Sequence, residues 1–144
     1  MSAMPGRTHP SPFEPLAAPS LDDFASLAER AWARIPESFR AAAGDVVFRV
    51  ADFADEETLA SLEIEDPFEL TGLYHGVDLT RRSLLDLPGK PATVWLYRRP
   101  ILDEWAENGE VGLGELIEHV LVHEIGHHFG LSDDDIDAIE ASAE

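Results

Sequence analysis

Cysteine is absent from this chain of 144 residues. Its absence excludes disulfide bonds, a thiol nucleophile and every thiolate metal site. Any tightly held metal ion must therefore be bound through nitrogen and oxygen, by histidine, aspartate or glutamate side chains.

Basic residues are scarce: 10 Lys and Arg stand against 29 Asp and Glu, so the formal net charge is −19. A protein that binds a phosphate backbone needs a cationic surface to displace counterions. An anionic membrane surface also attracts cationic segments. We therefore expect neither nucleic acid nor a membrane to be a partner.

Long apolar runs are missing too. No segment approaches the roughly 20 apolar residues that span a bilayer, and the first twenty residues hold no apolar stretch of signal-peptide length. These features predict a cytoplasmic protein. With 44% apolar residues, a chain of this length can build one modest core, which predicts a single domain.

The amino-terminal segment, residues 1–19, contains five of the ten prolines. A short proline-rich stretch without a periodic apolar face does not offset the entropy cost of ordering it. The sequence thus predicts a disordered tail over residues 1–19 and a folded domain over residues 20–144.

Periodicity and capping signals predict the secondary structure of that domain. A capping-box pattern at Ser20 and Asp23 opens an amphipathic helix. Further helical segments are expected at Pro36–Ala43 with a stop at Gly44, at Asp55–Leu62, and at Val111–Phe129 with a stop at Gly130. Runs rich in β-branched and aromatic residues predict short strands at Val46–Ala51, Leu70–Tyr74 and Thr93–Tyr97.

The longest predicted helix carries the pattern H-E-x-x-H at His123, Glu124 and His127. Two histidines four residues apart lie on one helix face, so both imidazoles can reach one ion. Glu124 is rotated by about 100° from His123 and can address a water without binding the ion. These could also be ordinary polar residues. On a mostly apolar helix these side chains still need polar partners, because an unpaired buried polar group costs roughly 1 to 3 kcal/mol.

A third ligand is expected after the helix. Gly130 can reverse the chain in a left-handed conformation, and Asp133 follows in the extended pattern H-E-x-x-H-x-x-G-x-x-D. Asp134, Asp135 or a water could serve instead. Ser132 could also cap a last helix whose first turn contains these aspartates, and this is compatible with a ligand role for Asp133.

These motifs resemble the bacterial minimal-zincin family of metallopeptidases. The resemblance covers about residues 20–140 and rests on four segments: His123–Asp135, Leu70–Gly76, Leu79–Ser83 and Leu96–Pro100. It implies an α+β fold in which a small sheet packs against helices, including the H-E-x-x-H helix. It also implies zinc bound by His123, His127 and Asp133, with Glu124 as the catalytic carboxylate.

The first functional hypothesis is a zinc metallopeptidase that acts on a peptide or protein substrate, with Glu124 as the general base. The alternative is a weakly active or inactive zincin-like metal-binding module that acts through a protein partner. A third possibility is hydrolysis of a non-peptide amide. Methionine occurs only at Met1 and Met4, so no methionine turn can lie under the metal, and only residues 134–144 follow Asp133. We therefore expect a shallow cleft or one completed by a partner.

Several other residues are weaker candidates for a role in the site. His119 continues the histidine row, but a supporting or surface role is expected for it, and a polar contact is expected for His128. Tyr74 and His75 could donate hydrogen bonds to an oxyanion, although a strand tyrosine is more often structural. The segment Thr93–Tyr97 is a candidate exposed edge to which a peptide could add as a strand.

Overall fold

The computed structural model describes residues 17–76 and 92–135. Within these ranges the chain forms helices and strands in the following order: α1 (Leu21–Arg34), α2 (Glu37–Ala43), β1 (Val46–Ala51), α3 (Glu56–Ser61), the 3-10 helix η1 (Pro67–Glu69), β2 (Gly72–His75), β3 (Ala92–Tyr97), α4 (Arg98–Glu107) and α5 (Leu113–His128). The predicted tail over residues 1–19 lies almost entirely outside the described residues.

The strands form a mixed sheet in the order β1-β3-β2. β1 pairs with β3 in parallel, and β2 pairs with β3 antiparallel, with Tyr74 opposite Val94. The segment Thr93–Tyr97 therefore lies in the central strand. The prediction that it offers an exposed edge was wrong, because both of its sides are already paired with neighbouring strands. In the described sheet, β1 and β2 are the edges.

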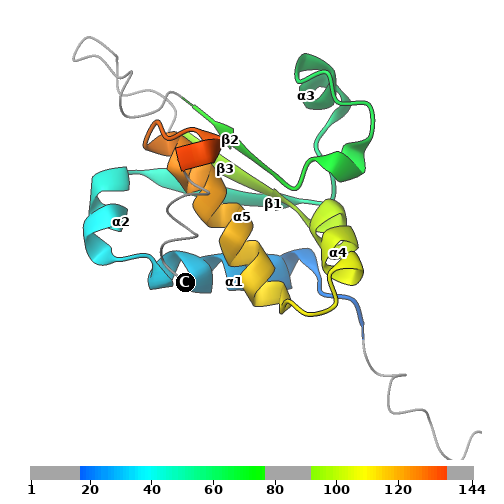
Figure 1. Ribbon diagram of the computed structural model, residues 1–144, viewed down its shortest axis with the longest axis horizontal. Helices are drawn as coiled ribbons and strands as arrows, with labels where there is room; N and C mark the ends of the chain where they lie inside the picture. Colours follow the sequence, from blue (N-terminus) through cyan, green and yellow to red (C-terminus); the bar gives the residue numbers. More distant parts are fainter. Residues whose placement is uncertain (1–16, 77–91, 136–144) are drawn as a thin grey trace, which may run out of the picture.

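Helices α1 and α5 pack together and cover one face of the sheet, α1 over β1 and α5 over β2 and β3 (Figure 1). Alternation along β3 divides its side chains between two hydrophobic clusters. Val94 and Leu96 are fully buried on the helix side. Tyr97 belongs to a smaller cluster on the other side, against which Trp95 packs. The α+β fold expected from the resemblance is confirmed.

Local signals start and end these elements as the sequence predicts. In the capping box of α1, the amide of Asp23 donates to Oγ of Ser20 (3.1 Å), and the amide of Ser20 donates to Oδ2 of Asp23 (2.8 Å). Gly44 ends α2 with a φ of 70°, which an L-residue rarely adopts. The strand β1 has the predicted bounds.

Helix α4 was not predicted. Its N-cap is Tyr97, whose side chain makes no capping hydrogen bond, and its first turn contains no acidic residue. Pro100 lies in that first turn, where a missing amide hydrogen is tolerated. The indole Nε1 of Trp105 donates to the carbonyl of Val111 (2.9 Å) and so fixes α4 against the segment that leads into α5.

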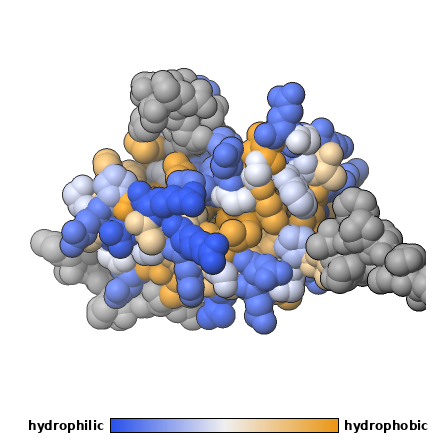
Figure 2. Space-filling view, turned by 90° about the horizontal axis from the view of Figure 1, so that it is seen from below, coloured by the Kyte–Doolittle hydropathy of each residue, from blue (hydrophilic) through white to orange (hydrophobic). Residues whose placement is uncertain are grey.

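The described surface is mostly polar. Large exposed hydrophobic side chains are spread over separate elements: Leu21, Phe39, Leu62 and Phe68. On the face in Figure 2, hydrophilic residues surround hydrophobic ones that show near the centre. No helix in the described ranges is long and apolar enough to cross a membrane.

Candidate metal centre

Helix α5 is the rigid base of the site. Its apolar row is buried against α1 and the sheet: Ile117 and Leu121 are fully buried, and Ile125 is 5% exposed. The side chains of His123 and His127 keep 26% and 33% of their surface exposed. The helix therefore holds its two imidazoles at a surface position while its other face is anchored in the core.

The end of α5 redirects the chain back towards these histidines. Gly130 has a φ of 80°, its amide donates to the carbonyl of His127 (2.9 Å), and the amide of Leu131 donates to the carbonyl of Gly126 (3.0 Å). This pair of bonds is a Schellman motif, which needs a left-handed residue where Gly130 lies. The sequence predicted the stop, and the structure supplies its geometry.

The chain reversal at Gly130 brings Asp133 close to the two histidines. Its Oδ1 is 2.9 Å from Nε2 of His123 and 3.1 Å from Nε2 of His127. Residues 133–135 are helical, and Ser132 and Asp135 exchange capping hydrogen bonds of 3.2 Å. The cap expected at Ser132 is confirmed, and Asp133 faces the histidines from the first turn of the helix that Ser132 caps.

Glu124 lies beside the two histidines. One ligand atom from each of His123, Glu124 and His127 falls within 4.8 Å of the others, so this group could hold a metal ion. The backbone amide of Tyr74 in β2 donates a hydrogen bond to the Glu124 carboxylate. Partial burial raises the pKa of Glu124, while the two histidines and the Tyr74 amide oppose that rise.

The close approach of β2 to α5 depends on a glycine. A Cβ at Gly72 would lie 2.7 Å from Cγ1 of Val120, 3.1 Å from the carbonyl oxygen of Trp95 and 3.3 Å from Cγ of Glu124. Because any side chain would collide here, Gly72 sets the spacing between the strand and the Glu124 carboxylate. Gly72 was not among the predicted site residues, although a glycine inside a strand pattern is a known sign of close backbone approach.

The comparison with protein families agrees with this geometry. A family model described as Zincin-like metallopeptidase matches residues 43–143, more than half of the chain. The chain belongs to the zincin-like metallopeptidase family. The family predicted from the motifs is thus confirmed, although the match begins at residue 43 and leaves out α1. A comparison with curated proteins gave no match.

Two of the weaker candidates in this zincin-like domain prove to be partners of each other. His128 is fully buried, and its Nδ1 lies 2.7 Å from the hydroxyl of Tyr74. Its Nε2 lies 2.6 Å from the carbonyl oxygen of Ala43. The polar contact expected for His128 is confirmed. The Tyr74 hydroxyl makes this contact, which agrees with the structural role favoured for a strand tyrosine over that of an oxyanion donor. His75 is exposed at the end of β2.

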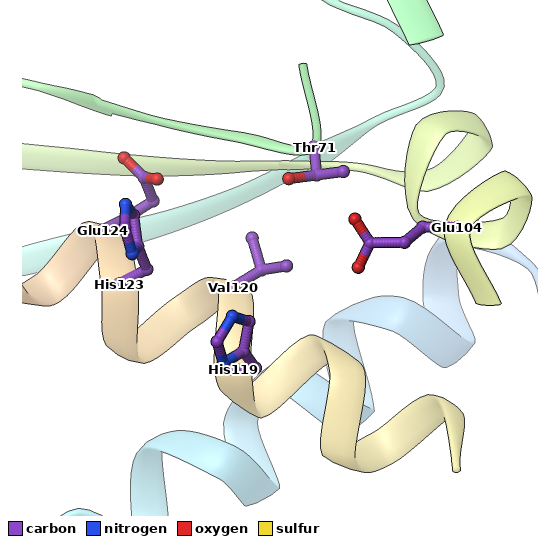
Figure 3. Close-up of a pocket in the computed structure, with 6 residues that line it drawn as sticks. All are labelled: Thr71, Glu104, His119, Val120, His123 and Glu124. Atoms are coloured by element: carbon purple, nitrogen blue, oxygen red, sulfur yellow. The ribbon is translucent and has the colours of Figure 1, made fainter. Parts of the chain in front are cut away.

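A pocket of about 180 Å³ adjoins the zincin-like centre (Figure 3). His119 lines it together with His123 and Glu124, so His119 lies next to the site. Thr71 and Glu104 come from other elements, and sequence analysis missed both. Glu104 lies on the unpredicted helix α4, so only the tertiary structure brings it here.

Proposed function

We propose that this protein is a zinc-dependent metallopeptidase that hydrolyses peptide bonds with Glu124 as the general base. One observation carries the proposal: Oδ1 of Asp133 contacts the Nε2 atoms of both His123 and His127, and a carboxylate oxygen of Glu124 lies within 4.8 Å of a ring nitrogen of each histidine. Membership of the zincin-like metallopeptidase family supports it.

The proposed ligands are His123, His127 and Asp133. Glu124 could complete an alternative triad with the same histidines, and its carboxylate also accepts a hydrogen bond from the Tyr74 amide. Asp133 instead contacts both imidazole nitrogens directly. Two imidazoles and one carboxylate suit zinc and leave a fourth position open, as in catalytic zinc sites. The donor set on this chain therefore fits the ion that the family implies.

The proposed chemistry divides between the ion and Glu124. When bound, zinc supplies a Lewis acid that lowers the pKa of a water and stabilises negative charge on the attacked carbonyl oxygen. The Glu124 carboxylate accepts the proton of the attacking water and passes it to the leaving amine. Its raised pKa suits a group that must both take up and release a proton.

The peptide is proposed to lie along β2. In the described sheet β2 is an edge strand, and it packs against α5 beside Glu124. An extended peptide can pair with such an edge through main-chain hydrogen bonds. As the proposed strand for peptide pairing, β2 replaces the segment Thr93–Tyr97, because that segment lies in the central strand of the described sheet.

Glu124→Gln tests the proposal. The change keeps the size of the side chain and removes the proton acceptor, so zinc content and thermal unfolding should stay close to wild type. Cleavage of a diverse peptide library should fall by a factor on the order of a hundred or more. Glu115→Gln, at an exposed position in the first turn of the same helix, is the matched control.

The outcomes separate the two function classes. A metal-binding module without activity would cleave no peptide in either form. Cleavage that survives Glu124→Gln undiminished would point to a contaminating protease and refute the mechanism.

A further inference from the structure

The pocket beside the metal centre is lined by residues from three parts of the fold. Its walls are Thr71, Glu104, His119, Val120, His123 and Glu124. Two of these residues, His123 and Glu124, belong to the proposed catalytic centre. A group bound in the pocket would therefore lie next to the bond that is cleaved.

The positions of the other walls are fixed by hydrogen bonds. The carbonyl of Thr71 accepts a bond from the amide of Tyr97 (2.9 Å), which extends the pairing of β2 with β3. The bond from Trp105 to Val111 holds α4, and with it Glu104, near the start of α5. His119 lies one helical turn before His123. These walls are parts of the scaffold.

The size of the pocket suits one side chain. A single water needs only about 10 to 15 Å³ of such space, so about 180 Å³ admits a larger group. Pockets that enclose a drug-sized ligand are larger, roughly 300 to 1,000 Å³. The space therefore matches part of a peptide substrate.

The chemistry of the walls favours a cation. Carboxylates occur at two places, Glu104 on one side and Glu124 on the other, and among the described residues no Lys or Arg lines the pocket. In Figure 3 the Glu104 carboxylate points across the pocket towards the side formed by α5. The oxygens of Glu104 and Thr71 can accept hydrogen bonds from ammonium or guanidinium groups, which only donate. Val120 offers an apolar contact for a methylene stem.

We propose that this pocket binds a lysine or arginine side chain of the substrate, with Glu104 as the specificity-determining residue. The proposal rests on the proposed peptidase function. It also agrees with the net charge of −19, which draws basic peptides towards the protein and repels acidic ones.

The first test compares peptides that differ at one position near the cleaved bond, with lysine, norleucine or glutamate there. Norleucine keeps an unbranched apolar stem and lacks the charge. Wild type should favour lysine over norleucine by about three- to five-fold in kcat/KM, the upper part of the range that an exposed ion pair supplies. In Glu104→Gln this ratio should fall clearly below the wild-type value, towards one, and Glu104→Lys should favour the glutamate peptide.

Glu107→Gln is the matched control, because Glu107 is an exposed acid on the same helix and does not line the pocket. It should keep the preference for lysine. A wild-type ratio of one would overturn the proposal. An equal loss in Glu107→Gln would overturn it as well, because general electrostatic attraction would then explain the preference.

A binding measurement separates this proposal from the peptidase proposal. Nα-acetyl-lysine amide, titrated into ¹⁵N-labelled wild type, should shift the amide signals of Thr71, Glu104 and His119, and the norleucine amide should not. Glu104→Gln should abolish the shifts. Shifts without any peptide cleavage would support the lysine-binding pocket and refute the peptidase proposal. Cleavage without a preference for lysine and without shifts would support the peptidase and refute the pocket proposal.

Discussion

The hydroxyl of Tyr74 lies 2.7 Å from Nδ1 of the buried His128, and Nε2 of the same imidazole lies 2.6 Å from the carbonyl oxygen of Ala43. A carbonyl only accepts, so Nε2 carries a proton and donates to Ala43, and in that tautomer Nδ1 is left to accept the hydrogen of the Tyr74 hydroxyl. One imidazole thereby joins β2, the last turn of α5 and the end of α2. It also satisfies a carbonyl that the end of α2 leaves without a helical partner.

We expect Tyr74→Phe to lower the free energy of unfolding by about 1 to 3 kcal/mol, because it leaves the buried Nδ1 of His128 without its donor. Urea unfolding at neutral pH measures this loss. Tyr97→Phe is the matched control: among the described residues, no hydrogen bond involves the hydroxyl of Tyr97. If both variants unfold like wild type, the contact between Tyr74 and His128 does not hold the strand.

We expect Asp133→Ala to raise the Kd for zinc by more than about 100-fold, since losing even an outer partner of a metal ligand often costs 10- to 100-fold. Asp134→Ala removes an exposed neighbour from the same turn and should change the Kd little. Competition with a chelator ranks the two variants. Equal Kd values would remove Asp133 from the ligand set.

We expect Gly72→Ala to lower the free energy of unfolding by about 1 to 3 kcal/mol, because the new Cβ would lie 2.7 Å from Cγ1 of Val120. Part of the cost should disappear in a Val120→Ala background, and a double-mutant cycle measures this coupling. Gly109→Ala is the control, since a Cβ there meets no atom within 4 Å. A cost that is the same in both backgrounds would contradict the steric explanation.

The raised pKa of Tyr97 predicts that the folded protein loses stability at high pH. Burial, and then the charges of Asp55 and Glu124, raise its pKa to about 12, against about 10 for an unperturbed tyrosine. The folded protein therefore keeps the phenol proton longer than the unfolded chain does. The stability tied to this proton is fully present below about pH 10 and is lost as the pH rises towards 12.

Over that range, the free energy of unfolding of wild type should fall by about 2 kcal/mol more than that of Tyr97→Phe. Denaturant titrations of both proteins between pH 9 and pH 12 provide the measurement. Parallel curves for the two proteins would show that the phenol of Tyr97 titrates normally.

The sequence by itself determined the features that depend on residues a few positions apart. The capping box of Ser20 and Asp23, the strand Val46–Ala51 and the turn at Gly130 all formed as expected. The same holds for the pairing of His123 with His127 on one helix face. Each of these follows from local dihedral preferences and helical spacing, which are readable from a short window.

Only the tertiary structure decided the rest. Strand order placed β3 in the centre, and β3 runs directly into α4, which carries no capping signal. The hydroxyl of Tyr74 found its partner 54 residues away, and the ring of His128 found a carbonyl 85 residues away. Such contacts depend on which faces of distant elements become buried together, and no local pattern encodes that choice. For the same reason, the sequence could place a candidate metal site on α5 but could not place Glu104 beside it.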